Sequence, residues 1–230
     1  EYFKGKKVLV TGHSGFKGSW LVSWLDVLGA EVVGLALDPP TTPSHFSVSG
    51  IDSRIEGHRM DIREKDKVVE LICRTEPDVV FHLAAQSLVY RSYREPHATI
   101  TTNAIGTVNV LEALRYLNKP VIAVLITSDK VYQNVEQIWG YREDDRLGGT
   151  DPYSASKGMA ELAIRSYVET AFKGNDCPIR IGIGRAGNVI GGGDWAENRI
   201  VPDCVRAWTE DKVAVVRKPT ATRPWQHVLE

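Results

Sequence analysis

Val8-Leu9-Val10-Thr11-Gly12-His13-Ser14-Gly15-Phe16-Lys17-Gly18 is the stretch of this chain that decides its fold. An apolar strand pattern runs into a glycine-rich turn, and apolar residues at helical spacing follow as far as Leu28. In such a turn the first glycine permits the tight bend, and the others let a pyrophosphate approach the backbone and the helix pack closely. The alternative is a glycine-rich turn without a ligand. We predict a dinucleotide site made by Gly12, Ser14, Gly15, Phe16, Lys17 and Gly18.

Short apolar runs alternate with helical patterns along the rest of the chain. The predicted strands cover residues 7–10, 31–37, 79–83, 121–127 and 179–185. The predicted helices cover residues 16–28, 65–73, 97–117 and 151–172, and a polar, proline-rich loop covers 38–53. This alternation predicts an α/β fold, a Rossmann-like doubly wound parallel sheet with helices on both faces.

The last part of the chain has a different pattern. We predict a helix over 199–209 and a short strand over 213–217, after a Gly191-Gly192-Gly193 loop. Residues 1–187 are therefore expected to form the dinucleotide-binding domain with its catalytic helix. Residues 188–230 are expected to begin a smaller C-terminal substrate-binding lobe, cut short because the pattern stops within an element.

Composition excludes several classes of protein. The chain has 230 residues and a net charge of −1, which argues against a nucleic-acid partner. It contains no apolar run long enough to span a membrane and no signal-peptide pattern at its start. Three scattered cysteines show neither metal-ligand spacing nor a disulfide framework, so we expect no metal and a cytoplasmic location.

Three further segments point to the cofactor. Asp38 follows the second strand, twenty residues after Gly18, at the sequence position of an acid that binds the adenosine ribose. A carboxylate there favours NAD over NADP. The alternative is a turn residue before Pro39 and Pro40. Asp61 and Ile62 follow a third strand, expected before residue 61 without defined bounds, where the adenine would lie. Asp61 is equally suited to be a helix N-cap. Small residues end the fourth strand and leave room for a cofactor or for close sheet packing: Leu83, Ala84 and Ala85.

Tyr153 and Lys157 are the strongest catalytic candidates. They are four residues apart, so both project from one face of a helix. A nearby ammonium is expected to lower the pKa of a tyrosine and make it a usable base. Thr127-Ser128-Asp129-Lys130 follows an apolar strand, and ligands of parallel sheets bind beyond the carboxyl ends of strands. This segment predicts substrate-orienting groups, or else a solvated turn.

Several longer motifs carry a family resemblance. They are Thr11–Trp20, His82–Val89, Thr127–Tyr132, Trp139–Asp145, Asp151–Lys157, Arg185–Trp195 and Arg223–His227. Together they resemble the nucleotide-sugar dehydratases of the extended short-chain dehydrogenase/reductase family, over nearly the whole chain. The resemblance implies NAD as the cofactor and CDP-glucose as the substrate.

The resemblance also implies a reaction. Tyr153 takes the proton of the hydroxyl on carbon 4 while NAD takes the hydride from that carbon. Water then leaves across carbons 5 and 6, the hydride returns to carbon 6, and CDP-4-keto-6-deoxyglucose forms. Ser128 binds the oxygen on carbon 4, and Asp129 protonates the leaving hydroxyl. The related dTDP-glucose dehydratases have a glutamate base where this chain has Lys130. A lysine can be that base only when its amine is neutral, so Lys130 is either the base or a cation that stabilises the enolate.

The remaining site residues follow from the same resemblance. It implies cofactor contacts for Asn103 and Ala186, and substrate contacts for Asn188, Arg199, Arg217 and Arg223. Asn188 also suits a turn, Arg199 a solvated helix start, and Arg223 a surface position beside Pro224. Gln86 and Ser87 are expected to face the sugar or to belong to a loop without contacts.

Other functions stay open at this stage. A nucleotide-sugar epimerase or reductase would keep Tyr153 and Lys157 but needs no acid–base pair at Asp129 and Lys130. A non-catalytic NAD-binding module is the third reading. The resemblance further implies a homodimer or homotetramer formed through the helices over 97–117 and 151–172. It also implies a place in deoxysugar biosynthesis, for example of a lipopolysaccharide O-antigen.

Overall fold

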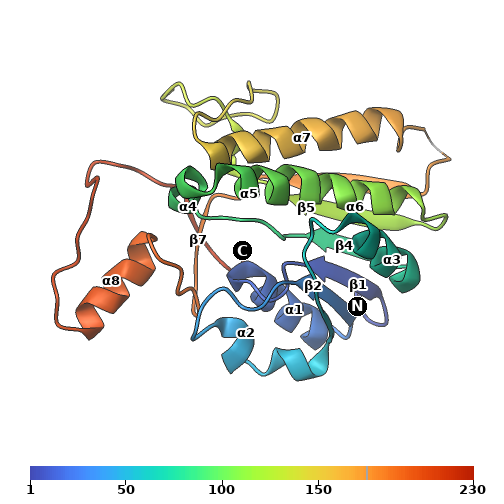
Figure 1. The fold of residues 1–230 in the computed structure, drawn as a ribbon, viewed down its shortest axis with the longest axis horizontal. Helices are drawn as coiled ribbons and strands as arrows, with labels where there is room; N and C mark the ends of the chain where they lie inside the picture. Colours follow the sequence, from blue (N-terminus) through green and yellow to red (C-terminus); the bar gives the residue numbers. More distant parts are fainter. Residues whose placement is uncertain (175) are drawn as a thin grey trace.

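A six-stranded parallel sheet is the centre of the molecule (Figure 1). The computed structural model describes residues 1–174 and 176–230. The sheet has the order β3-β2-β1-β4-β5-β6. Its strands are β1 (Lys7–Thr11), β2 (Glu31–Ala36), β3 (Glu56–Arg59), β4 (Val79–His82), β5 (Val121–Ile126) and β6 (Ile179–Gly184). This is the order of a doubly wound dinucleotide-binding fold, so the predicted fold class is confirmed.

Helices cover the two faces of the sheet in separate layers (Figure 1). The longer helices are α1 (Phe16–Val27), α3 (Lys65–Thr75), α6 (Gly106–Arg115), α7 (Pro152–Thr170) and α8 (Ile200–Thr209). The shorter ones are α2 (His45–Val48), α4 (Val89–Arg94) and α5 (Pro96–Ile100). α3, α6 and α7 pack on one face around Leu9 and Leu125, whereas α1 packs on the other around Val8 and Val10.

The second layer of helices does not reach β5 and β6. Along β5, Val121, Ala123 and Leu125 are buried under the α6 and α7 layer. The alternate residue Ile122 points to the other face, where it is 44% exposed, and Ile183 on β6 is 36% exposed. Among the described residues, helices therefore cover both faces of the sheet at β1 to β4, as predicted. At β5 and β6 they cover only one face.

Three predicted elements differ from the structure. The stretch over 38–53 is not all loop, because Ser44 caps α2 through its side chain and a 3₁₀ turn follows at Ile51–Arg54. The predicted helix over 97–117 contains a π-helical turn at Thr101–Ile105 between α5 and α6. The strand expected over 213–217 is wrong, since residues 213–216 have no regular structure.

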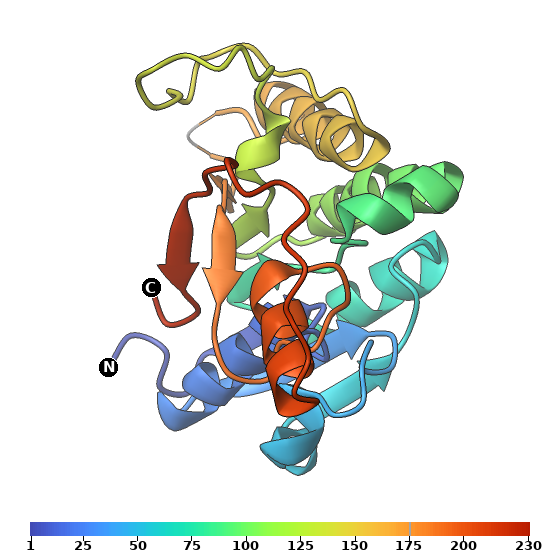
Figure 2. The ribbon, with the colours of Figure 1, turned by 90° about the vertical axis from the view of Figure 1, so that its left-hand side faces the viewer.

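A separate two-stranded parallel sheet forms near the end of the chain instead. β7 (Asn188–Ile190) pairs with β8 (Trp225–His227), with Asn188 opposite Trp225. Figure 2 shows these two strands side by side, next to α8. The two paired segments are more than thirty residues apart in the sequence. The pairing therefore does not depend on the apolar pattern of residues 213–217.

The buried carboxylate of Glu161 fastens α7 to the ends of β5 and β6. Its side chain has no exposed surface, accepts a hydrogen bond of 2.7 Å from Thr127 Oγ1, and pairs with Arg185 Nε at 2.8 Å and Arg185 Nη2 at 2.6 Å. Arg185 also donates to the Tyr132 hydroxyl at 2.6 Å. A buried ion pair costs much to break, because the remaining charge is left without its partner.

We predict that Glu161→Gln lowers the free energy of unfolding by about 3 kcal/mol, because it leaves the buried Arg185 guanidinium unpaired. Chemical denaturation measures this change. Glu169→Gln on the same helix is the matched control, since its ion pair with Lys173 is 70% exposed on both sides. We expect the control to change the free energy by less than about 0.5 kcal/mol. Equal effects of the two substitutions would contradict the anchoring role of Glu161.

His82 is a neutral core residue that joins the sheet to α6. Its Nδ1 lies 2.7 Å from Thr11 Oγ1, and its Nε2 lies 3.0 Å from Thr107 Oγ1. Thr107 already donates its hydroxyl proton to Asn103 O, so Nε2–H is the donor and Nδ1 the acceptor. Burial, and then the charge of Lys157, lower the pKa of His82 to about 3.

A pH dependence of stability follows from His82. Between pH 6.5 and about 3 the unfolded chain binds a proton that folded His82 does not, so stability is lost as the pH falls. One such histidine contributes at most about 1.4 kcal/mol per pH unit. We expect His82→Gln to lose less stability between pH 7 and pH 5 than the unmodified chain, measured by urea unfolding. The exposed His97→Gln is the control. An unchanged pH dependence in His82→Gln would refute this account.

Candidate functional site

A single large cleft lies beyond the carboxyl ends of β1, β4 and β5, and it encloses about 1990 Å³. Nearly all of the predicted site residues line it. They are Gly12, Ser14, Gly15, Phe16, Lys17, Gly18, Asp38, Asp61, Ile62, Leu83, Ala84, Ala85, Gln86, Ser87, Ser128, Asp129, Lys130, Tyr153, Lys157, Ala186, Asn188, Arg199, Arg217 and Arg223. Asn103 does not line it. The parallel sheet thus brings residues from distant segments to one edge, as ligand sites of this fold require.

The glycine-rich turn has the tight geometry that its sequence predicts. Gly12 has φ +77°, and an added Cβ there would lie 2.7 Å from Ala84 N. An added Cβ at Gly18 would lie 2.0 Å from Gly12 O, so no side chain fits at either position. Gly15 is the N-cap of α1 and supplies no side-chain hydrogen bond. The first N–H groups of α1 are therefore not capped by Gly15 and can receive an anion such as a pyrophosphate.

The two acids expected near the adenosine both have arginine partners. The side chain of Asp38 is 90% exposed, and Arg59 Nε lies 3.2 Å from its Oδ1. The side-chain hydrogen bonds of Arg63 lower the pKa of Asp61, whose Oδ1 lies 3.0 Å from Arg63 Nε. Asp61 is not a helix N-cap, because α3 begins later and Glu64 occupies that position. Both carboxylates line the cleft, as a ribose or adenine contact would need.

Tyr153 and Lys157 are deeply buried on one face of α7. Tyr153 is 8% exposed, and Lys157 is 5% exposed with its Nζ 3.2 Å from Ile126 O. Burial, followed by the charge of Lys17, lowers the pKa of Lys157 to about 8. Burial raises the pKa of Tyr153, and its hydrogen bond with Ser128 lowers it by less. The expected decrease in the tyrosine pKa is thus wrong for this structure, because the loss of hydration outweighs the neighbouring charges.

Ser128, Asp129 and Lys130 form a connected polar group beside Tyr153. Ser128 Oγ donates to Asp129 Oδ1 at 3.1 Å, and Lys130 Nζ donates to the same oxygen at 3.0 Å. Lys130 Nζ also lies 3.2 Å from Asn188 Oδ1. The acid and the amine are therefore in direct contact, and both are about one third exposed. A reactant in the cleft can reach a hydroxyl, a carboxyl group and an amine at one place.

Positive charge gathers next to this group. Arg199 Nη1 pairs with Asp194 Oδ2 at 2.8 Å, and Arg199 Nη2 donates to Ser87 Oγ at 3.1 Å. Burial, and then the charge of Arg199, lower the pKa of Lys17. Arg217 and Arg223 lie farther along the cleft wall, where they donate to Asn198 Oδ1 and to Thr222 O. Cations grouped in this way suit a diphosphate.

Asn103 has a different place from the one expected. It has no exposed surface, its Oδ1 accepts from Gln86 N at 2.8 Å, and its Nδ2 donates to Gln86 O and to Ser156 Oγ. It therefore fixes the backbone at Gln86 from behind the cleft wall. The π-helical turn that carries Asn103 directs its amide to Gln86.

Sequence reasoning missed four residues that shape the site. Glu161 and Arg185 fasten the Tyr153 helix, Asp194 orients Arg199, and Trp20 holds the loop before Asp194. Arg185 and Asp194 stand inside a motif that was noticed, but nothing in the spacing connects either with its partner. Among the described residues, no cluster of three potential metal ligands occurs. No helix of the described chain is both long and apolar enough to cross a membrane.

Known proteins with a similar sequence are nucleotide-sugar enzymes. The chain is 47% identical to CDP-glucose 4,6-dehydratase of Salmonella typhimurium, over 100% of this chain and 65% of that protein. The chain thus spans less than two thirds of the length of this curated relative.

Solved structures with the same fold point the same way. The dTDP-glucose 4,6-dehydratase of Streptomyces venezuelae, solved with NAD bound, has a TM-score of 0.82 at 25% identity and covers 96% of this chain and 68% of its own. The UDP-glucuronic acid 4-epimerase of Bacillus cereus, in complex with UDP-glucuronic acid and NAD, has a TM-score of 0.80 at 27% identity, with 96% and 69% covered. The model of the GDP-mannose 4,6 dehydratase family matches residues 9–230. This chain therefore belongs to the GDP-mannose 4,6 dehydratase family.

Proposed function

We propose that the protein containing this chain dehydrates CDP-glucose to CDP-4-keto-6-deoxyglucose with NAD as a bound cofactor. One observation carries the proposal: buried Tyr153 and Ser128 line the cleft together with an acid and an amine that touch each other, Asp129 and Lys130. Oxidation at carbon 4 needs the first pair, whereas elimination of water needs the second. The 47% identical relative is named for this reaction, which supports the choice of sugar nucleotide.

The chain's own residues fit NAD. The glycine-rich turn leaves room for a pyrophosphate at the start of α1, and Asp38 and Asp61 line the far part of the same cleft. When bound, NAD accepts the hydride from carbon 4 and later supplies it to carbon 6. Lys157 lies at the inner end, where its amine can hold the ribose hydroxyls and stabilise the tyrosinate. Similar solved structures that contain NAD support this placement.

The protein's residues then divide the reaction between them. Tyr153 removes the proton of the hydroxyl on carbon 4, and the Ser128 hydroxyl, which lines the same part of the cleft, holds that oxygen. The resulting ketone acidifies the proton on carbon 5, which Lys130 removes as a neutral amine and returns to carbon 5 when the hydride adds at carbon 6. Asp129, in its protonated form, gives its proton to the hydroxyl that leaves carbon 6 as water. Arg199, Lys17 and Asn188 hold the diphosphate, and the further arginines Arg217 and Arg223 extend this binding surface.

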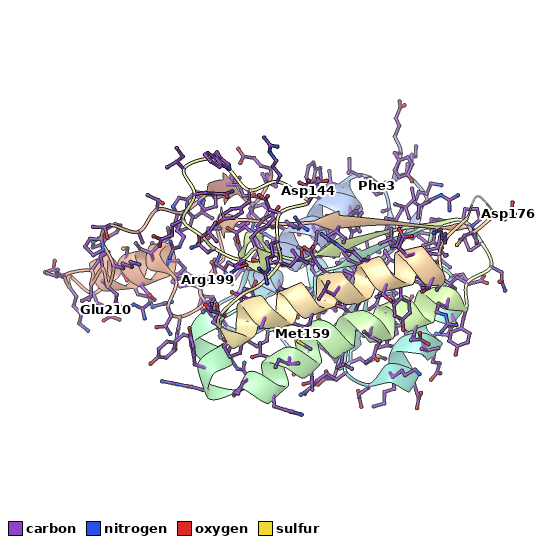
Figure 3. All side chains as sticks on the ribbon, turned by 90° about the horizontal axis from the view of Figure 1, so that it is seen from above. Phe3, Asp144, Met159, Asp176, Arg199 and Glu210 are labelled. Carbon is purple, nitrogen blue, oxygen red and sulfur yellow. The ribbon has the colours of Figure 1, made fainter. Side chains whose placement is uncertain are left out.

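Residues 188–230 are proposed to begin the sugar-nucleotide lobe, and a second copy of the chain is proposed to pack on α7. Figure 3 shows α7 lying beside the helix formed by α5 and α6, with Met159 on α7. Met159 and Leu162 on α7 are 44% and 60% exposed, so this helix offers apolar surface that a second copy could cover. We propose a homodimer or homotetramer in the cytoplasm, and a product used to make the deoxysugars of a lipopolysaccharide O-antigen.

Mass spectrometry of the product tests the proposed reaction. The full-length protein, incubated with CDP-glucose and NAD, is expected to give a product lighter by one water. Asp129→Asn cannot protonate the leaving hydroxyl, so we expect its turnover to fall by about a hundredfold. Asp144→Asn, in an exposed loop, is the matched control and should keep full turnover. A product of unchanged mass would show an epimerase and would contradict the dehydratase.

The role of Lys130 has a separate test. Lys130→Met removes the base for carbon 5 but leaves Tyr153 and Ser128 in place. We therefore expect the variant to oxidise carbon 4 in a single turnover and then stop, with reduced nicotinamide remaining on the protein. Single-turnover absorbance spectroscopy measures this accumulation. Full dehydration by Lys130→Met at the normal rate would assign the base to another group.

A further inference from the structure

The loop Gly191–Gly193 is seated directly on α1, the helix that begins in the glycine-rich turn. Trp20 Nε1 donates a hydrogen bond of 2.9 Å to Gly192 O. A Cβ added at Gly191 would lie 3.3 Å from Phe16 Cζ, so the two elements are in close contact. Figure 2 shows the segment between β7 and α8 passing across α1. Trp20 and Gly192 are 172 residues apart in sequence, so this contact is purely tertiary.

His45 contacts both the Gly191–Gly193 loop and α1. Its ring stacks on Trp20 with centroids 4.2 Å apart and planes at 18°. Its Nδ1 lies 3.0 Å from Ser19 Oγ, which already donates its proton to Phe16 O, so Nδ1–H is the donor. Gly193 has φ +81°, and an added Cβ would lie 2.9 Å from His45 Cα. Only glycine can follow this path over His45 without a shift of the backbone.

The residue after this loop controls the direction of Arg199. Asp194 is largely buried, with its side chain 7% exposed, and its Oδ2 accepts from Arg199 Nη1 at 2.8 Å. The second terminal nitrogen of the same guanidinium lies 3.1 Å from Ser87 Oγ. A shift of Gly192 or Gly193 on α1 would therefore move Asp194 and turn Arg199 away from the cleft.

We propose that Trp20 and His45 are positioning residues that hold Arg199 ready for the diphosphate of the sugar nucleotide. α1, which begins in the glycine-rich turn proposed to bind the cofactor's pyrophosphate, then also holds Arg199 in place through the loop Gly191–Gly193. The proposal rests on the proposed function, because it assigns Arg199 to the substrate diphosphate. Neither Trp20 nor His45 touches the reacting atoms, so their effect passes through Asp194 and Arg199.

The direct test is Trp20→Phe, which keeps an aromatic ring against His45 and removes only the N–H donor. We expect the KM for CDP-glucose to rise about fivefold, with kcat and the melting temperature unchanged, because one hydrogen bond to the loop is lost. Trp24→Phe, the same substitution on the same helix at a side chain that is 50% exposed, is the matched control and should change nothing.

Two further measurements separate positioning from a general effect on folding. In the Arg199→Ala background, Trp20→Phe should add no further increase in KM, since both act on one contact. His45→Ala should raise the KM as Trp20→Phe does, while the Kd for NAD, measured by titration calorimetry, stays the same. An unchanged KM in Trp20→Phe, or a parallel fall of kcat and melting temperature, would overturn the proposal.

Binding of CDP alone distinguishes this proposal from the proposed reaction. If the unmodified protein does not turn over CDP-glucose, the dehydratase function fails. Calorimetry of CDP binding then still tests whether Trp20 positions Arg199, since CDP carries the same diphosphate. Weaker CDP binding in Trp20→Phe than in Trp24→Phe would support the positioning role, whereas equal binding would refute it.

Discussion

Glu161 carries the buried charge on which the arrangement of the candidate site depends. Its ion pair with Arg185 and its hydrogen bond with Thr127 join α7 to the ends of β5 and β6. Thr127 directly precedes Ser128, and α7 carries Tyr153 and Lys157. One buried carboxylate therefore sets the distance between the helix that carries Tyr153 and Lys157 and the loop that carries Ser128 and Asp129. A network this well satisfied is rigid, and catalysis needs its groups held in a fixed geometry.

The site gathers its cations where the sheet leaves room for a ligand. Lys157 is buried at the inner end, Lys17 lies in the glycine-rich turn, and Arg199 is held by Asp194 on the other side. Burial lowers the pKa of both lysines, and repulsion lowers it further, from Arg199 at Lys17 and from Lys17 at Lys157. Bound phosphates would relieve that repulsion, so these charges favour an anionic ligand. The fold thus groups positive charge at the place where the proposed cofactor and sugar nucleotide would meet.

Sequence reasoning reached the local features and missed most of the tertiary ones. The glycine-rich turn, five of the six strands of the central sheet and the Tyr153–Lys157 pair have periodic or short-range signals, so their positions could be predicted. No bounds were predicted for the remaining strand, β3. The pairing of β7 with β8 has no such signal, and an apolar run at 213–217 was wrongly taken for a strand. The Glu161–Arg185 pair and the Trp20–Gly192 bond link residues whose proximity exists only after the sheet has formed. The pKa of Tyr153 was misjudged for a related reason, because burial depends on the whole fold and not on its neighbour in the helix.

A crystal structure of the full-length protein with NAD and a CDP-sugar that lacks a leaving group at carbon 6 tests the central claim most directly. The account predicts that the oxygen on carbon 4 lies within hydrogen-bond distance of Tyr153 and Ser128, with carbon 6 facing Asp129. It further predicts that the diphosphate contacts Arg199. A sugar bound away from Tyr153, or a diphosphate held without Arg199, would contradict it.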